Sequence, residues 1–162
     1  CVVKNMPAGV GEPVFEKLDA NLSKAVMSIG AVKGVEIGDG FAVASACGSE
    51  NNDNFKIEND RIVKSTNHAG GILGGMSDGS DIILRAAVKP TPSIAATQHT
   101  VNKAGEEIDI SIHGRHDPMI VPRAVVVVAV VVVEAMTAIT LVDMLFMGMT
   151  SRLDRIADFY KR

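Results

Sequence analysis

The stretch that bears most on the fold is GRHDPMIVPRAVVVVAVVVVEAM, residues 114–136. A cluster of charged residues runs into a nearly pure valine tract, which could be a membrane segment, a buried core element or the floor of a functional site. The apolar run covers only residues 124–133, whereas a helix needs about 20 apolar residues to cross a bilayer. We therefore expect a protein that does not span a membrane.

The same stretch predicts a buried helix. Pro122 suits the first turn of a helix, and residues 124–146 are apolar on almost every side, as in a fully buried central helix. The β-branched valines disfavour a helix, but the length of the pattern favours one. A strand here would be followed at once by the helix-like sequence EAMTAITLVDMLF.

Composition predicts one globular domain. The chain has 162 residues, 47% of them hydrophobic, and a net charge of −3. This length and hydrophobic content are enough for a single core. Scattered Lys and Arg, one Tyr and no Trp argue against nucleic-acid binding. Cys1 and Cys47 form neither a metal-type motif nor a disulfide framework, and no secretory signal is visible. We expect a reduced, cytoplasmic protein.

The rest of the chain alternates helical and strand patterns, with turn residues between them. Apolar residues at three- and four-residue spacing predict a helix, and β-branched runs broken by Gly, Asn and Asp predict strands and hairpins. We expect a helix at 13–28, strands within 32–37 and 41–46, a hairpin at 55–64, a strand at 82–90 and a hairpin around 103–105. The expected fold class is α+β.

The first candidate site is the glycine-rich loop, residues 67–81, which contains five glycines. Its backbone must either adopt positive φ or let another group approach closely. Successive amides could form an anion-binding nest. However, the phosphate-binding GK[ST] sequence and the strand–GxGxxG–helix context are missing, so the loop alone favours a plain flexible connection.

Two further stretches carry groups that could do chemistry. KPTPS, residues 89–93, places a cation beside two hydroxyls and two prolines, a grouping that can hold a phosphate, although an ordinary strand exit is the simpler interpretation. In GRHDP, residues 114–118, an aspartate adjoins an apolar run that can shift its pKa, and a salt bridge at a helix start is the alternative. The histidine spacing does not define a metal site, so we predict no metal.

Taken in order, the strings in this chain resemble the chorismate synthase family. They are GEPVFEKLDA, MSIGAVKGVEIGDGF, GSENND, NHAGGILGGMSDG, KPT.S and GRHDP followed by PRAV and EAM. The resemblance runs from Gly11 to Phe146 and rests on several long, uncommon strings.

The resemblance implies an FMN-dependent lyase of aromatic amino-acid biosynthesis. Such an enzyme converts 5-enolpyruvylshikimate 3-phosphate to chorismate and phosphate by 1,4-anti elimination, using reduced FMN without net redox change. It also implies a sandwich with helices packed between antiparallel sheets, and a homotetramer. Whether the protein has its own NADPH-dependent flavin reductase is left open.

The family's functional residues can be carried onto matching positions of this chain. The family's aspartate near flavin N5 corresponds to Asp117, whose implied role is to manage proton transfer there. Asn67 is implied as a secondary FMN contact. The implied FMN-binding residues are Gly30, Ala31, Gly74, Lys89, Pro90, Thr91, Pro92, Ser93 and Arg115.

The match departs from the family in two places. VVVAVVVV fills residues 126–133, where the family has only a few residues. The family's N-terminal half, with two acid histidines, the arginines that grip the substrate and a serine region, finds no counterpart. We expect residues 1–162 to be the C-terminal portion of a single domain, inactive alone. The alternatives are a non-catalytic core or oligomerisation piece, and a nucleotide-binding module.

Overall fold

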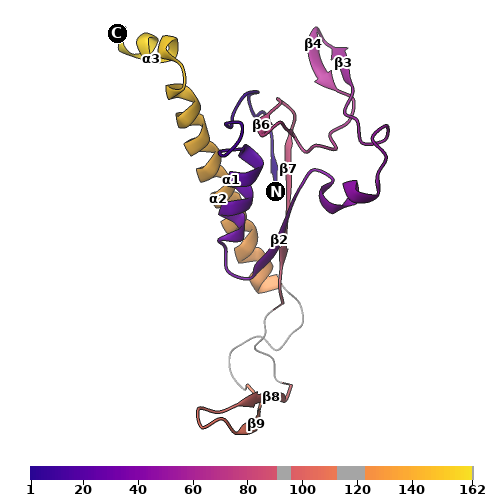
Figure 1. Cartoon of the computed structure of the whole chain (residues 1–162), viewed down its shortest axis with the longest axis vertical. Coiled ribbons are helices and arrows are strands. Elements are labelled where there is room, and N and C mark those ends of the chain that lie inside the picture. Colours follow the sequence, from indigo (N-terminus) through magenta and orange to yellow (C-terminus); the bar gives the residue numbers. More distant parts are fainter. Residues whose placement is uncertain (91–95, 113–122, 162) are drawn as a thin grey trace.

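The computed structural model describes residues 1–90, 96–112 and 123–161. Helices and antiparallel strands are mixed along the chain, which agrees with the α+β expectation (Figure 1). The elements are β1 (Val2–Val3), α1 (Leu18–Met27), β2 (Val32–Ile37), η1 (Gly40–Ser45), β3 (Phe55–Glu58), β4 (Arg61–Lys64), β5 (Ile72–Leu73), β6 (Met76–Ser77), β7 (Ile82–Val88), β8 (Gln98–Val101), β9 (Glu107–Ile110), α2 (Arg123–Thr150) and α3 (Leu153–Tyr160).

A three-stranded antiparallel sheet in the order β1-β7-β2 forms the centre of the molecule. Strand β7 pairs with β2 from Leu84, opposite Ile37, to Val88, opposite Val32. The predicted strand at 82–90 is confirmed as β7, although it ends at Val88. This pairing places the two ends of β7 beside different loops.

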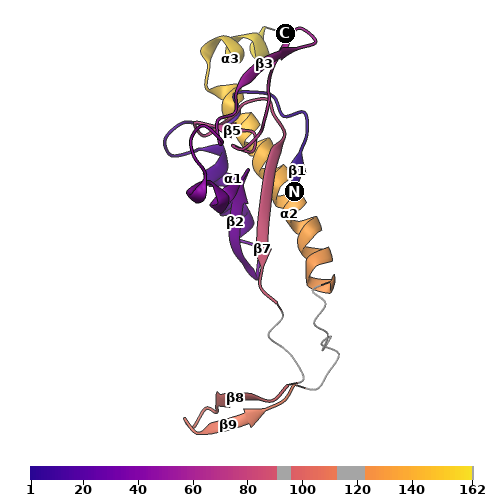
Figure 2. The ribbon, with the colours of Figure 1, turned by 90° about the vertical axis from the view of Figure 1, so that its right-hand side faces the viewer.

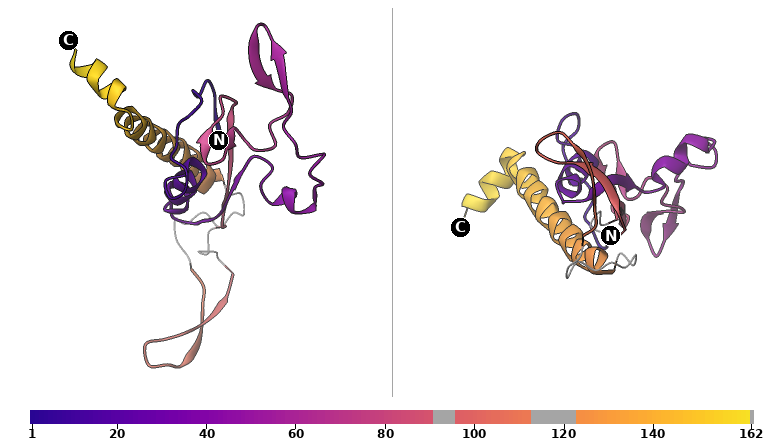
Figure 3. Two further views of the ribbon diagram at one scale, coloured as in Figure 1. Left: turned by 45° about the horizontal axis from the view of Figure 1, so that its top comes forward. Right: turned by 90° about the horizontal axis from the view of Figure 1, so that it is seen from below.

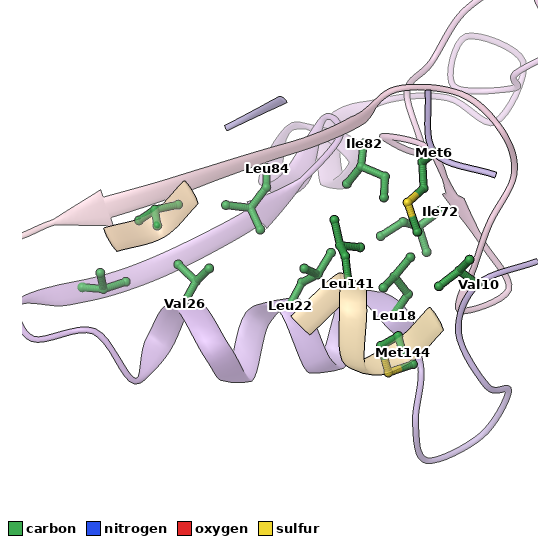
Figure 4. Close-up of a cluster of buried hydrophobic side chains, with 12 residues drawn as sticks. Met6, Val10, Leu18, Leu22, Val26, Ile72, Ile82, Leu84, Leu141 and Met144 are labelled. Carbon is green, nitrogen blue, oxygen red and sulfur yellow. The ribbon is translucent and has the colours of Figure 1, made fainter. Parts of the chain in front are cut away.

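Helices α1 and α2 lie on one face of this sheet and bury its apolar side (Figures 2 and 4). Leu18, Leu22 and Val26 of α1 are fully buried, as is Ile82 of β7. Each such side chain stabilises the fold by about 1.5–3 kcal/mol. The core therefore joins the beginning, middle and end of the chain.

Helix α1 begins at Leu18, so the predicted start at residue 13 is wrong. Val14 has a φ of 78°, which a right-handed helix cannot contain. The side chains of Val14 and Phe15 are 66% and 88% exposed. Their apolar spacing continued the helical pattern by chance.

The predicted strand at 41–46 is also wrong, because residues Gly40–Ser45 form the 3-10 helix η1. Gly38 and Gly40 both adopt positive φ and turn the chain away from β2. The amide of Phe41 then donates to Glu36 Oε1 at 3.1 Å, and Phe41 itself is exposed. These two glycines, on either side of Asp39, end the strand before residues 41–46 can pair.

Both predicted hairpins are confirmed. In β3–β4, Phe55 pairs with Lys64, and the turn residues Asn59 and Asp60 have φ values of 50° and 57°. Positive φ at both positions matches the hairpin turn that Asn and Asp favour. The second hairpin pairs β8 with β9.

The valine tract belongs to the long helix α2, which confirms the helix prediction (Figure 3). Its expected complete burial is wrong for the described side chains from Val130 onward. A buried stripe of Val133, Thr137, Leu141 and Met144 faces the core, whereas Val131, Ile139, Val142 and Phe146 are exposed. We call this second set the outer stripe of α2.

One helical segment in the described chain is long and apolar enough to cross a membrane. It runs from Val130 to Thr150, with a mean hydropathy of 2.0, and 22% of it is buried. The length argument from residues 124–133 thus underestimated the apolar segment. Length and composition alone are weak support for a membrane span, because helices in protein cores have the same properties.

Candidate functional site

Four of the predicted cofactor residues lie together at one end of β7. Lys89 and Pro90 follow the strand, and Gly30 and Ala31 precede β2. The Lys89 amide donates to Ala31 O at 2.8 Å. Ala31 has a φ of 70°, a conformation uncommon for alanine. We call these four residues the β7-exit group.

A pocket of about 350 Å³ lies between the end of β7 and α2, at the lower end of the size range of ligand sites, and none of the β7-exit group lines it. Val88, which directly precedes Lys89, lines it from the sheet, and Glu134 lines it from α2. The other lining residues are Cys1, Val2, Ala86, Val130 and Val133. This mainly apolar pocket suits a flat ring, whereas an anionic group would be placed better beside Lys89.

Gly74 lies near the opposite end of β7, in the turn of the small β5–β6 hairpin. The glycine-rich loop is therefore ordered, and its interpretation as a plain flexible connection is wrong. At Gly74 the φ is 63°, and a Cβ there would meet no described atom within 4 Å. At Gly70, by contrast, a Cβ would clash with the backbone of Gly38. Gly70 permits close backbone packing, while Gly74 leaves its backbone accessible.

Asn67 also lies at this end, and its side chain is used within the loop. Its Nδ2 donates to Asp81 O at 2.8 Å, and its Oδ1 accepts from Gly71 N at 2.8 Å. These bonds hold the glycine-rich loop closed. Its expected role as a secondary FMN contact stays a prediction.

The two groups of predicted residues do not converge on one point within the described chain. Strand β7 runs from Ile82 to Val88, which corresponds to about 20 Å at the usual rise of a strand. A ligand that touches both Gly74 and the β7-exit group must therefore extend along the sheet.

The remaining predicted residues, Thr91, Pro92, Ser93, Arg115 and Asp117, lie outside the described residues. Their roles stay predictions. Within residues 1–90, 96–112 and 123–161, no three His, Cys, Asp or Glu side chains converge as metal ligands would.

Sequence reasoning missed a buried charged cluster beside the glycine-rich loop. The side chains of Lys64, Asp53 and Asp78 are only 5%, 7% and 10% exposed. Lys64 Nζ lies 3.7 Å from Asp53 Oδ2 and makes a short contact with Asp78 Oδ2. Asp53 belongs to the family-like string GSENND, and that string was the available signal.

A second missed contact joins the same loop to the start of η1. His68 Nδ1 lies 2.6 Å from Asp39 Oδ2, and both side chains are partly exposed. The Asp39 amide also donates to His68 O at 2.9 Å. The pair fixes the loop against the turn that follows β2.

The sequence model of the family described as Chorismate synthase matches residues 1–146. The chain belongs to the chorismate synthase family. The chorismate synthase of Agathobacter rectalis is 66% identical over 162 residues, which cover all of this chain and 43% of that protein. That of Archaeoglobus fulgidus is 60% identical over 153 residues, covering 93% of this chain and 41% of that protein.

A solved structure of a chorismate synthase has the same fold over the matched region. It superposes with a TM-score of 0.69 at 29% identity and covers 98% of this chain and 40% of that chain. This chain therefore spans about two-fifths of the length of the chorismate synthases it matches.

Proposed function

We propose that this chain supplies one side of the active site of a chorismate synthase. The reaction is the 1,4-anti elimination of phosphate from 5-enolpyruvylshikimate 3-phosphate, giving chorismate. Membership of the chorismate synthase family carries this proposal. Because the chain spans about two-fifths of its relatives, we propose that it acts as the C-terminal portion of a single domain.

Reduced FMN fits the described residues as one wall of its site. Gly30 has open space where a Cβ would stand, so a ligand can approach the backbone there. The exposed Lys89 can bind an anion by a charge-assisted hydrogen bond, and the pocket lined by the preceding Val88 is mainly apolar. Bound reduced FMN would supply electron density to the departing phosphate.

The chain's own residues bind, orient and move protons in this proposal. The β7-exit group and Gly74 contact the cofactor, with Thr91, Pro92, Ser93 and Arg115 extending the contact and Asn67 supporting it. Asp117 holds or moves a proton near the reacting edge of the ring. Since these residues form only one wall, we expect the isolated chain to bind FMN weakly.

The outer stripe of α2 supports the sandwich form of the fold. Its apolar side chains lie opposite the face that packs on α1, and a helix that is apolar on both faces is typical of the middle of a layered core. We infer that further chorismate synthase sequence, including an antiparallel sheet, covers this stripe. A homotetramer is part of the same proposal.

The outer stripe could instead enter a membrane, but its neighbours argue against this. Asp143 lies near the middle of the segment Val130–Thr150, and a charged residue at the centre of a membrane helix costs about 2.5–3.5 kcal/mol. We therefore propose that the protein is cytoplasmic and does not insert into a membrane. We also propose that it has no nucleic-acid partner.

A chimera tests the cofactor site. Residues 1–162 would replace the matching part of the Agathobacter rectalis chorismate synthase, and FMN binding would be titrated by flavin fluorescence. We expect saturable binding by the chimera and at least tenfold weaker binding by the isolated chain, because one wall is missing there. A well-folded chimera that binds no FMN would contradict the proposed site and favour a non-catalytic packing role.

A further inference from the structure

The charged cluster beside the glycine-rich loop is built from three segments. Asp53 lies in the loop between η1 and β3, Lys64 ends β4, and Asp78 follows β6. Lys64 Nζ lies between the two carboxylates, in contact with Asp78 and 3.7 Å from Asp53 Oδ2. We call Asp53, Lys64 and Asp78 the clasp.

Asp53 binds the chain that leads into the glycine-rich loop. Its Oδ1 accepts from Thr66 Oγ1 and His68 N, each at 2.8 Å, and its Oδ2 accepts from Ala69 N at 2.9 Å. A carboxylate with this many donors fixes the direction of the backbone that carries them.

Asp78 binds the other end of the loop. Its Oδ1 accepts from Ser80 N at 2.9 Å, while its Oδ2 meets Lys64. The β5–β6 turn with Gly74 lies between these two anchored ends. Lys64 therefore joins the entry and the exit of the loop through one buried cation.

Burial separates the clasp from an ordinary surface ion pair. On the same hairpin, Lys56 Nζ lies 3.3 Å from Glu58 Oε2, but the two side chains are 50% and 58% exposed. Exposed pairs of this kind contribute little, whereas removing one partner of a buried pair leaves an uncompensated charge. The clasp is thus a site where one substitution has a large local effect.

The pKa values of both carboxyls agree with this geometry. Burial by itself raises the pKa of Asp53, but hydrogen bonds from Ala69, His68 and Thr66 and the charge of Lys64 outweigh it and lower the pKa. Burial likewise raises the pKa of Asp78, but the hydrogen bonds from Lys64 and Ser80 and the charge of Lys64 outweigh it and lower the pKa. Both side chains are held in the charged form that the clasp requires.

We propose that Asp53, Lys64 and Asp78 are positioning residues that fix the glycine-rich loop, and with it the backbone of Gly74 that meets the cofactor. The part that concerns the cofactor rests on the proposed function. The clasp touches no reacting group, so its effect on FMN passes through the loop.

The first test is amide hydrogen exchange of the 162-residue chain. Lys64→Met should speed exchange of the His68 and Ala69 amides by about tenfold or more, because their acceptor is released. Amides in α1 should keep their protection. Lys56→Met on the same hairpin is the matched control and should change neither region.

A milder variant guards against general unfolding. Thr66→Val removes one donor to Asp53 without leaving a buried charge, and it should speed exchange at His68 and Ala69 by a smaller factor. Unchanged exchange at both amides in Thr66→Val and Lys64→Met would overturn the proposal.

The second test measures FMN affinity in the chimera. Lys64→Met should weaken FMN binding about tenfold, Lys64→Arg should recover part of the loss because it restores the cation, and Lys56→Met should match the parent. Faster exchange together with unchanged FMN affinity would overturn the positioning role. If the parent chimera binds no FMN, the proposed function fails, and the exchange result still decides whether the clasp orders the loop.

Discussion

At the scale of single residues, the candidate site depends on where charge is accessible. Lys89 is fixed through its amide to Ala31 O, while its side chain is exposed at the end of β7. Asn67, in contrast, already binds the backbone at Asp81 and Gly71. Of these two predicted contacts, Lys89 is the better placed to bind an anionic group.

Lys89→Ala in the chimera should weaken FMN binding by about 1.5–3 kcal/mol, the usual strength of a hydrogen bond to a charged group. Lys33→Ala, on the exposed side of β2, is the control and should leave the affinity unchanged. Calorimetric titration measures both variants. An unaltered affinity in Lys89→Ala would remove this residue from the site.

Asp117→Asn keeps the size of the side chain and removes the titratable carboxyl. If Asp117 manages a proton near the flavin, the kcat of the FMN-saturated chimera should fall by about 100-fold or more, with little change in FMN affinity. If it forms a salt bridge at the helix start, thermal stability and FMN affinity should fall together. A kcat close to that of the parent would end the catalytic assignment.

At the scale of elements, the sequence patterns correctly predicted the helices and hairpins that local sequence determines. The apolar spacing from Leu18 to Val26 and the Asn59-Asp60 turn both gave the observed elements. The errors at Val14 and at Gly40–Ser45 occur where positive φ interrupts a pattern. Hydrophobicity does not encode that conformation, and at Val14 the residue type gives no hint of it.

The clasp could not be predicted from spacing, because Asp53, Lys64 and Asp78 meet only through tertiary folding. Spacing also could not predict that the candidate residues lie at the two opposite ends of β7. The β7-exit group forms because Val32 pairs with Val88, and this register is a property of the sheet. Family strings located the candidate residues, and the pairing showed which of them meet.

Leu22 tests the packing of α1 on the sheet. It is fully buried, so Leu22→Ala should lower the free energy of unfolding by about 2–5 kcal/mol. Phe15→Ala removes a larger but 88% exposed side chain and should change it by less than about 0.5 kcal/mol. Urea unfolding monitored by circular dichroism measures the free energy of unfolding of both variants. An equal loss of this free energy in the two variants would contradict the described core.

The clasp also predicts how stability depends on pH. The pKa values of Asp53 and Asp78 in the fold lie below the ordinary value of 3.8, so their contribution is complete above that pH. It is lost as the pH falls from 3.8 through the lower folded values, because the unfolded chain then binds more protons. Asp53→Asn should reduce the loss of thermal stability as the pH falls below 3.8. If Tm falls with pH as steeply in this variant as in the parent, the lowered pKa of Asp53 is contradicted.

At the scale of the whole molecule, the chain presents a core on one side of α2 and an apolar stripe on the other. The long strings shared with chorismate synthases extend over both the sheet and this helix. A packing module would need only the helix and its stripe. The proposed enzyme also needs the β7-exit group and the glycine-rich loop to contact the cofactor, and Asp117 to transfer a proton.

The rate of chorismate formation by the chimera tests the central claim most directly. With reduced FMN and 5-enolpyruvylshikimate 3-phosphate, we predict turnover within about tenfold of the Agathobacter rectalis parent, since the grafted residues would supply a complete wall of the site. The isolated 162-residue chain should give none. A folded, FMN-saturated chimera without chorismate formation, or turnover by the isolated chain, would contradict the account.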